Sequence, residues 1–169
     1  HPRWFVQRCL KEFGFEETTA LCQANNTIAP LVLRVNSGKI QALELVERLR
    51  GAGVHAEASP CLHEAVRLSG LRQDLARLPG FQDGWFQVQD EASQAVSLIV
   101  DPRPGERILD LCAGFGGKTT HLGMLMANTG RIIAVDRSSW KLHELSQNAH
   151  RQGLTTVTTV VDDVRELSP

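Results

Sequence analysis

A glycine-rich stretch carries the residues best suited to chemistry in this chain of 169 residues. It reads ILDLCAGFGGKTTHLG and runs from Ile108 to Gly123. An apolar run ends on the acid Asp110, three glycines follow within four positions, and Lys118 comes next. Glycine-rich turns after a strand hold phosphates, dinucleotides or S-adenosylmethionine, because a residue without a Cβ lets the backbone approach a ligand closely. The spacing of the residues decides among these ligands.

Two of the three ligand classes fit the spacing poorly. A Walker A loop has the pattern G-x-x-x-x-G-K-[ST] and wraps a phosphate. The end of the pattern is present as GKT, but its first glycine falls on Cys112. The dinucleotide pattern G-x-G-x-x-G matches Gly114 and Gly116, whereas its third glycine falls on Thr119. ATP, GTP, NAD and FAD are therefore disfavoured.

Acidic residues end three successive predicted strands. Asp110 would lie near the amino-acid end of S-adenosylmethionine, Asp136 would take the ribose hydroxyls, and Asp162 or Asp163 would face the adenine amino group. Parallel strands end at one edge of an open α/β sheet, where such sheets bind ligands. Asp110 and Asp136 could instead cap the helices that follow them, and Asp162 and Asp163 could lie in a solvated turn. Chance alone would rarely place an acid at the end of three successive strands. The predicted cofactor is S-adenosylmethionine.

Alternating elements position these acids in the last part of the chain. After a helix over 91–100 and a Pro-Gly turn at 102–105, the pattern predicts strand 107–112, helix 118–128, strand 131–136, helix 139–152 and strand 156–163. Strands alternating with helices indicate a parallel sheet. The fold class is therefore α/β: the first βαβαβ half of a Rossmann-like methyltransferase domain, incomplete at Pro169.

A small α+β subdomain is predicted before it. Strand 31–36, a helix from an N-cap at Ser37, strands 54–59 and 64–70, helix 71–79 and strand 84–90 give the order βαββαβ. That order is ferredoxin-like and is shared with RNA-recognition modules. The first helix would bury a stripe of Ile40, Leu43, Val46 and Leu49.

Residues 1–29 are predicted as a lead-in of two short helices that part at Gly14 and end at 25–26. The predicted domains are thus 1–29, 30–89 and 90–169. Because the first residue is His1 and not Met, we expect the chain to be part of a longer protein.

Composition excludes several classes of protein. An apolar fraction of 42% and a net charge of -1 describe an ordinary globular protein rather than one coated with positive charge for nucleic acid. No apolar run reaches membrane-spanning length, so no membrane partner is expected. The four cysteines have no C-x-x-C spacing, which favours a reducing cytoplasm and argues against a metal centre or disulfides. Cys9, Cys22 and Cys61 are expected to be buried or half-buried.

The motif DLCAGFGGKTTHL resembles DLCAAPGGKT, the cofactor motif of RNA cytosine-C5 methyltransferases of the NOL1/NOP2/Sun family, in particular its RsmB/Sun (Fmu) branch, which acts on 16S ribosomal RNA. The segments HPRWFVQRCLKEFG, ANNTIAPLVLRVN, GWFQVQDEASQAV and AVDRSSWKLHELSQNAHRQGL are similar to that branch in order and spacing. The resemblance covers essentially the whole chain. It departs at Phe115, where the family usually has Pro, and at Trp140, where Arg is usual.

The resemblance implies the roles of individual residues. The loop residues that would wrap the methionine and adenosyl parts of S-adenosylmethionine are Cys112, Ala113, Gly114, Phe115, Gly116, Gly117 and Lys118. Asp136 would bind the ribose, and Asp163, with Asp162 as the alternative, would follow the third strand. The thiol of Cys112 is expected to pack against its neighbours.

Catalysis is expected to lie elsewhere. The two catalytic cysteines of the family, one of which attacks cytosine C6, follow the third strand, so they are expected beyond Pro169. The chain itself is then expected to bind cofactor and RNA without transferring a methyl group. The alternative is a non-catalytic RNA-binding or assembly module with a Rossmann scaffold.

The predicted partner is RNA, and 16S ribosomal RNA by resemblance. The positive residues of the α+β subdomain that could contact phosphates are Arg34, Lys39, Arg48, Arg50, Arg67, Arg72 and Arg77. Glu44/Arg48 and Glu47/Arg50 are spaced as pairs on one helix, which favours a solvated face. His55, His63 and His121 are interpreted as surface or helix residues. An incomplete sheet exposes apolar side chains and strand edges, so self-association is also expected.

Overall fold

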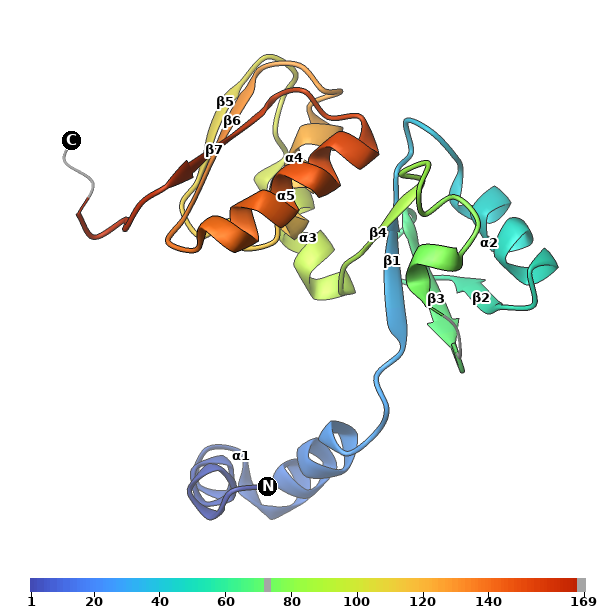
Figure 1. Cartoon of the computed structure of the whole chain (residues 1–169). Helices are drawn as coiled ribbons and strands as arrows, with labels where there is room; N and C mark the ends of the chain where they lie inside the picture. The colour runs from blue at the N-terminus through green and yellow to red at the C-terminus, as the bar shows by residue number, and fades with distance from the viewer. Residues whose placement is uncertain (72–73, 167–169) are drawn as a thin grey trace. The chain divides into compact units, whose positions relative to one another are not determined.

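The computed structural model describes residues 1–71 and 74–166 and divides the chain into two compact units, His1–Pro30 and Leu31–Pro169. The first unit is helix α1 (Arg3–Asn25). At Gly14 φ is 77° and ψ is -177°, so the helix is interrupted there and runs as two stretches (Figure 1). The predicted pair of short helices is confirmed, and Asn26 caps the second.

The second unit begins with a four-stranded antiparallel sheet in the order β2-β3-β1-β4. Its elements are β1 (Leu31–Val35), α2 (Ala42–Gly51), β2 (His55–Ala58), β3 (Ala65–Ser69), a 3-10 turn η1 (Leu75–Arg77) and β4 (Phe86–Val88). The strands and their order confirm the ferredoxin-like prediction. The second predicted helix, over 71–79, is reduced to η1 in its described part, and its residues 72–73 lie outside the described residues.

Helix α2 differs from its prediction at its start. Residues 37–39 form a turn, so the helix begins at Ala42 with Gln41 as its N-cap, and the predicted cap at Ser37 is wrong. The buried stripe changes accordingly. Leu43 is 70% exposed, whereas Leu45 is fully buried against the sheet.

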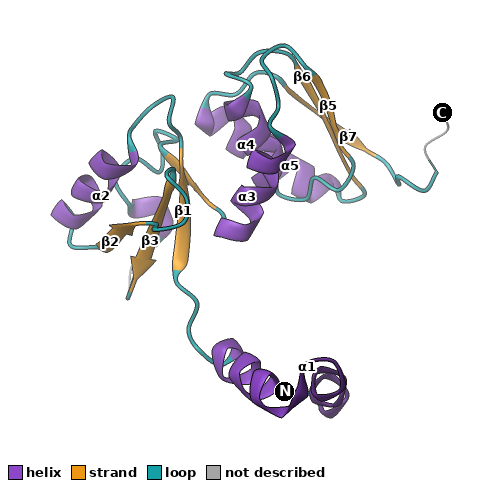
Figure 2. Cartoon of the chain, turned by 180° about the vertical axis from the view of Figure 1, so that it is seen from behind, coloured by secondary structure: helices purple, strands orange, loops and turns teal. Residues whose placement is uncertain are grey.

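The chain continues into a three-stranded parallel sheet in the order β5-β6-β7. The elements are α3 (Glu91–Val100), β5 (Arg107–Asp110), α4 (Gly117–Leu125), β6 (Arg131–Asp136), α5 (Ser139–Gln152) and β7 (Val157–Val161). Helices α4 and α5 cover one face of the sheet, where Leu122 packs with Ile132 and Leu145 packs with Ala134 (Figures 1 and 2). The predicted Rossmann-like half is confirmed.

Polar side chains join the two sheets into one unit. The α2 face of the antiparallel sheet is apolar, but the opposite face presents Arg34, Arg67 and Gln87. Arg67 forms an ion pair of 2.7 Å with Glu91 of α3, Gln87 accepts a hydrogen bond from Arg151 of α5, and Arg34 reaches α4 and α5. In RNA-recognition modules the corresponding sheet face stacks bases. Here its polar side chains bind the methyltransferase-like half instead.

Candidate cofactor site

The glycine loop lies across the ends of β5 and β6. Asp110 is the last residue of β5 and Asp136 the last of β6, and these two strands are neighbours. The Gly114 amide donates to Oδ2 of Asp136 at 2.9 Å, and the Ala113 amide donates to the carbonyl of Val135 at 3.0 Å. The structure therefore brings both acids and the loop together at the carboxyl edge of the sheet.

Two loop glycines have backbone conformations that disfavour any side chain. Gly114 has φ 55° and Gly116 has φ 80°. A Cβ at Gly116 would lie 2.4 Å from Cγ of Leu145 in α5. The close packing of loop on helix therefore requires glycine at this position. Gly116 is also the N-cap of α4 and offers no side-chain acceptor, so the first-turn amides of α4 remain available to an anion.

Asp110 binds within the loop rather than capping the next helix. Its Oδ2 accepts a hydrogen bond from Oγ1 of Thr119 at 2.7 Å, and its Oδ1 accepts one from the Cys112 amide at 3.3 Å. Since the N-cap of α4 is Gly116, the interpretation of Asp110 as a helix cap does not hold.

Asp136 is held as a carboxylate between two backbone amides. Its Oδ1 accepts from the Ser138 amide at 2.9 Å, and its Oδ2 from Gly114. These bonds, the Ser138 amide foremost, together with the charges of Lys141 and Arg137, lower the pKa of Asp136 below its usual value. Ser138 itself caps α5, so Asp136 does not cap that helix. Its fixed charge beside the loop suits an acceptor for hydroxyl groups.

The acids after β7 differ from each other. The guanidinium of Arg165 binds both carboxylate oxygens of Asp163, at 3.0 and 2.6 Å, and Arg137 lies 3.5 Å away. These contacts, Arg165 first, lower the pKa of Asp163 to about 2. Asp162 accepts only the Asp163 amide among the described residues. Asp163 is thus already engaged by two cations, and Asp162 is the freer carboxylate.

The two departures from the family pattern contact each other. The rings of Phe115 and Trp140 meet edge to face, with centroids 5.3 Å apart and planes at 90°. The ammonium of Lys141 lies 5.8 Å from the centre of the Phe115 ring. An aromatic pair thus links the loop to α5 where the family usually has Pro and Arg. Cys112 beside it is exposed, so the expectation that its thiol packs is wrong.

A small hollow of about 120 Å³ lies where the loop meets the segment after β4. It is lined in part by the predicted residues Asp110, Cys112, Gly117 and Lys118. Gln89 and Ser93 also line it, and neither was predicted from the sequence. The only sequence signal for them was their place in the resembling segment GWFQVQDEASQAV.

Arg34 was predicted as an RNA contact, and this prediction is wrong because the side chain is fully buried. Its guanidinium donates to Oε1 of Gln89 at 2.6 Å, the carbonyl of Gly117 at 2.5 Å, Oγ1 of Thr120 at 2.9 Å and Oε1 of Gln152 at 2.7 Å. Burial lowers the pKa of Arg34 to about 9. Arg34 therefore ties the antiparallel sheet to the beginning of α4.

Other predictions about polar residues had mixed outcomes. Arg48 pairs with Glu44 at 3.2 Å as predicted, whereas Arg50 donates to the carbonyl of Ala56 and forms no ion pair with Glu47 among the described residues. Arg72 lies outside the described residues. His121 is in a helix but is only 2% exposed, and burial lowers its pKa to about 3. Cys61 is exposed rather than buried.

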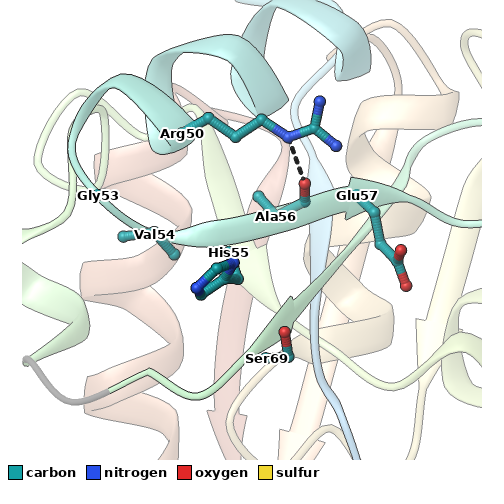
Figure 3. A pocket seen from close by; sticks show the side chains of 7 residues that line it. All are labelled: Arg50, Gly53, Val54, His55, Ala56, Glu57 and Ser69. Carbon is teal, nitrogen blue, oxygen red and sulfur yellow. Dashed lines mark hydrogen bonds between the residues drawn. The ribbon is translucent and has the colours of Figure 1, made fainter.

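A separate hollow of about 430 Å³ lies at the outer edge of the antiparallel sheet, along β2 (Figure 3). Nε of Arg50 donates to the carbonyl of Ala56 at 2.8 Å and so covers a backbone acceptor of this edge strand. His55 and Glu57 line the hollow as well. None of the predicted cofactor residues lies there, so we assign no cofactor to it.

Comparison with known proteins agrees with this geometry. The profile of the ferredoxin-like domain of RsmF/B-like methyltransferases matches residues 1–73, and that of the 16S rRNA methyltransferase RsmB/F family matches residues 97–169. Both profiles thus identify domains of RsmB/F methyltransferases in this chain. The resemblance inferred from the cofactor motif is thereby confirmed.

Individual RsmB/F relatives are similar over nearly the whole chain. A probable ribosomal RNA small subunit methyltransferase B of Synechocystis sp. is 38% identical over 92% of the chain and 35% of the relative. The corresponding enzyme of Pseudomonas syringae pv. tomato is 37% identical over 98% and 36%. The crystal structure of the protein PH0851 superposes with a TM-score of 0.92 at 32% identity, covering 98% of this chain and 37% of that one. The chain thus spans about a third of the length of these relatives.

Proposed function

We propose that the chain is the cofactor-binding and RNA-binding portion of a methyltransferase that modifies ribosomal RNA with S-adenosylmethionine. The observation that supports this most strongly is the contact of Asp136 with the Gly114 amide. It holds the carboxylate that would bind the ribose beside a loop whose two left-handed glycines permit close approach. In this proposal Asp110 lies at the amino-acid end of the cofactor, and Asp162, or Asp163 if it releases Arg165, lies at the adenine.

The proposed reaction of the longer protein is transfer to cytosine C5, in a reducing cytoplasm. The family resemblance places two catalytic cysteines after the third strand, and none of the four cysteines of this chain follows β7. Residues 90–169 would hold the cofactor, and residues 30–89 would contact RNA. We expect the chain alone to bind S-adenosylmethionine without methylating 16S ribosomal RNA.

Contacts to RNA would come from backbone phosphates rather than stacked bases. The sheet face that stacks bases in RNA-recognition modules is bound to α3, α4 and α5. Exposed cations such as Arg48 therefore remain the candidates, and affinity should fall steeply with added salt. None of the described helices combines the length and apolarity needed to cross a membrane.

Calorimetry with S-adenosylmethionine and S-adenosylhomocysteine tests the proposal. Heat of binding with either ligand that disappears in Asp136→Ala supports it. Asp101→Asn is a control, because it removes an exposed carboxylate that contacts only Arg103 among the described residues, and asparagine tolerates the left-handed backbone at this position. Absence of binding by the unaltered chain contradicts cofactor binding by these residues and favours the scaffold alternative.

We also propose that the chain self-associates through the uncovered face of β5–β7. Leu109 and Val160 in these strands are 56% and 38% exposed. The described helices α4 and α5 lie on the other face of the sheet (Figure 2). Contiguous exposed apolar side chains favour association. Sedimentation should show an association that Leu109→Lys weakens, and a monomer at every concentration would contradict it.

A further inference from the structure

A buried hydrogen-bond donor without a partner belongs to a residue that lines the cofactor hollow. Gln89 is 6% exposed, and its Nε2 has no hydrogen-bond partner among the described residues. Buried polar groups without partners are rare and costly, so each one asks for an explanation such as a bound ligand. Gln89 lines the hollow beside the glycine loop, where a ligand is already proposed.

The orientation of the Gln89 amide follows from its other contact. Arg34 donates to its oxygen at 2.6 Å, and a guanidinium can only donate. The oxygen must therefore face Arg34, which turns the NH₂ group away from it. The backbone of Gln89 is held as well, since its carbonyl accepts from Nε2 of Gln94 at 2.9 Å. Both ends of the residue are thus fixed by buried contacts.

The NH₂ group of Gln89 lies beside the start of α4. A Cβ built on Gly117 would lie 3.8 Å from Nε2 of Gln89, an ordinary van der Waals distance. The first turn of α4 has no side-chain cap, and Lys118 lines the same hollow. Donors, a helix N-terminus and an ammonium together favour an anionic group.

The hollow also offers one negative charge. Asp110 lines it together with these donors. A group that is both anionic and cationic matches such a lining, and the amino-acid end of S-adenosylmethionine carries a carboxylate and an ammonium on one carbon. Asp110 would take the ammonium, which leaves the carboxylate for Gln89 and the start of α4.

We propose that Gln89 donates a hydrogen bond from Nε2 to the carboxylate of the cofactor, and that Arg34 is a positioning residue that holds Gln89 in the donating orientation. This inference rests on the proposed function. It makes the antiparallel sheet part of the cofactor site, because Arg34 belongs to β1 and Gln89 directly follows β4. The subdomain that is proposed to contact RNA would thus also bind the amino-acid end of the cofactor.

Two ligands separate this role from a structural one. S-adenosylhomocysteine carries the amino-acid group, whereas 5′-methylthioadenosine keeps the adenosine and lacks that group. Gln89→Glu keeps an oxygen for Arg34 and replaces the donor by an acceptor. It should raise the Kd of S-adenosylhomocysteine at least about tenfold, as expected for a lost hydrogen bond to a charged group, and leave that of 5′-methylthioadenosine unchanged.

Gln87→Glu is the matched control. It makes the same chemical change two residues earlier, where Gln87 also accepts from an arginine, the half-buried Arg151, but does not line the hollow. It should alter neither Kd. Arg34→Lys should reproduce the selective loss of S-adenosylhomocysteine. Gln89→Met, which removes the donor without adding charge, repeats the test if Gln89→Glu does not fold.

The outcomes are distinguishable. Selective loss of S-adenosylhomocysteine supports the inference. Equal weakening of both ligands, or of neither, overturns the role of Gln89 while the proposed function stands. Failure of the unaltered chain to bind either ligand overturns the proposed function, and this inference with it.

Discussion

Replacing Arg34 by methionine tests how the two sheets are joined. The variant keeps a long side chain in the buried site but removes every donor. It leaves two acceptors without a donor: Oε1 of Gln89 and Oε1 of Gln152. The carbonyl of Gly117 opens helix α4 and still accepts from the hydroxyl of Thr120 at 3.4 Å, so it is not counted. The hydroxyl of Thr120 still donates to the carbonyl of Gly116 at 2.7 Å, so we do not count it.

The expected loss follows from these acceptors. A buried polar group left unsatisfied costs about 1–3 kcal/mol. Removing a buried cation, whose burial lowers its pKa to about 9, offsets part of this cost. We therefore take about 1 kcal/mol for each of the two acceptors and expect the free energy of unfolding to fall by about 2 kcal/mol. For a domain of this size the Tm would drop by about 6 °C.

Thermal and urea unfolding of Arg34→Met measure this loss. Arg48→Met is the control, because Arg48 is exposed and its pair with Glu44 should contribute no more than about 0.5 kcal/mol. If Arg34→Met is as stable as Arg48→Met, then Arg34 does not hold the sheets together and the buried network is not the junction described.

Three further changes have defined outcomes. Burial lowers the pKa of His121 to about 3, so the unfolded state binds more protons than the folded state between pH 6.5 and 3. The free energy of unfolding should therefore fall on acidification by up to about 1.4 kcal/mol per pH unit. In His121→Met this dependence of the free energy of unfolding on pH should disappear from unfolding titrations. Gly116→Ala combines a positive φ with a clash against Leu145 and should lower the free energy of unfolding in urea by about 2–5 kcal/mol. Gly105→Ala, where φ is also positive but nothing lies within 4 Å of the added Cβ, should lower it by about 1 kcal/mol. Alanine substitutions of Phe115 and Trp140 in a double-mutant cycle should show a coupling of about 0.5–1 kcal/mol, and additive effects would contradict their pairing.

The sequence predicted what depends on local pattern. The strands and helices of the parallel sheet follow from hydrophobic periodicity, and helix α5 has the predicted bounds, Ser139–Gln152. Asp110 and Asp136 were found because strand ends can be read from the chain, and neighbouring parallel strands then bring them together. The glycine loop was found for the same reason, since its required conformations are carried by residue type.

The sequence did not predict what depends on distant contacts. Arg34 lies between the apolar Leu33 and Val35 in β1, as a solvent-facing side chain on a half-buried strand would. Its partners lie 55 to 118 positions away, and nothing near Arg34 indicates that α4 and α5 cover that face. Gln89 was missed for the same reason, because its role depends on the loop that packs beside it. The start of α2 was misplaced because the turn at 37–39 begins with Ser37, a residue that is equally common at turns and caps.

The central claim is that a sulfonium nucleoside binds where β5 and β6 end. A crystal structure of the chain with S-adenosylhomocysteine tests it most directly. The account predicts the ribose hydroxyls within about 3 Å of the Asp136 carboxylate, with the homocysteine end in the hollow beside Gln89 and Asp110. A ligand bound elsewhere, or a ribose turned away from Asp136, would contradict it.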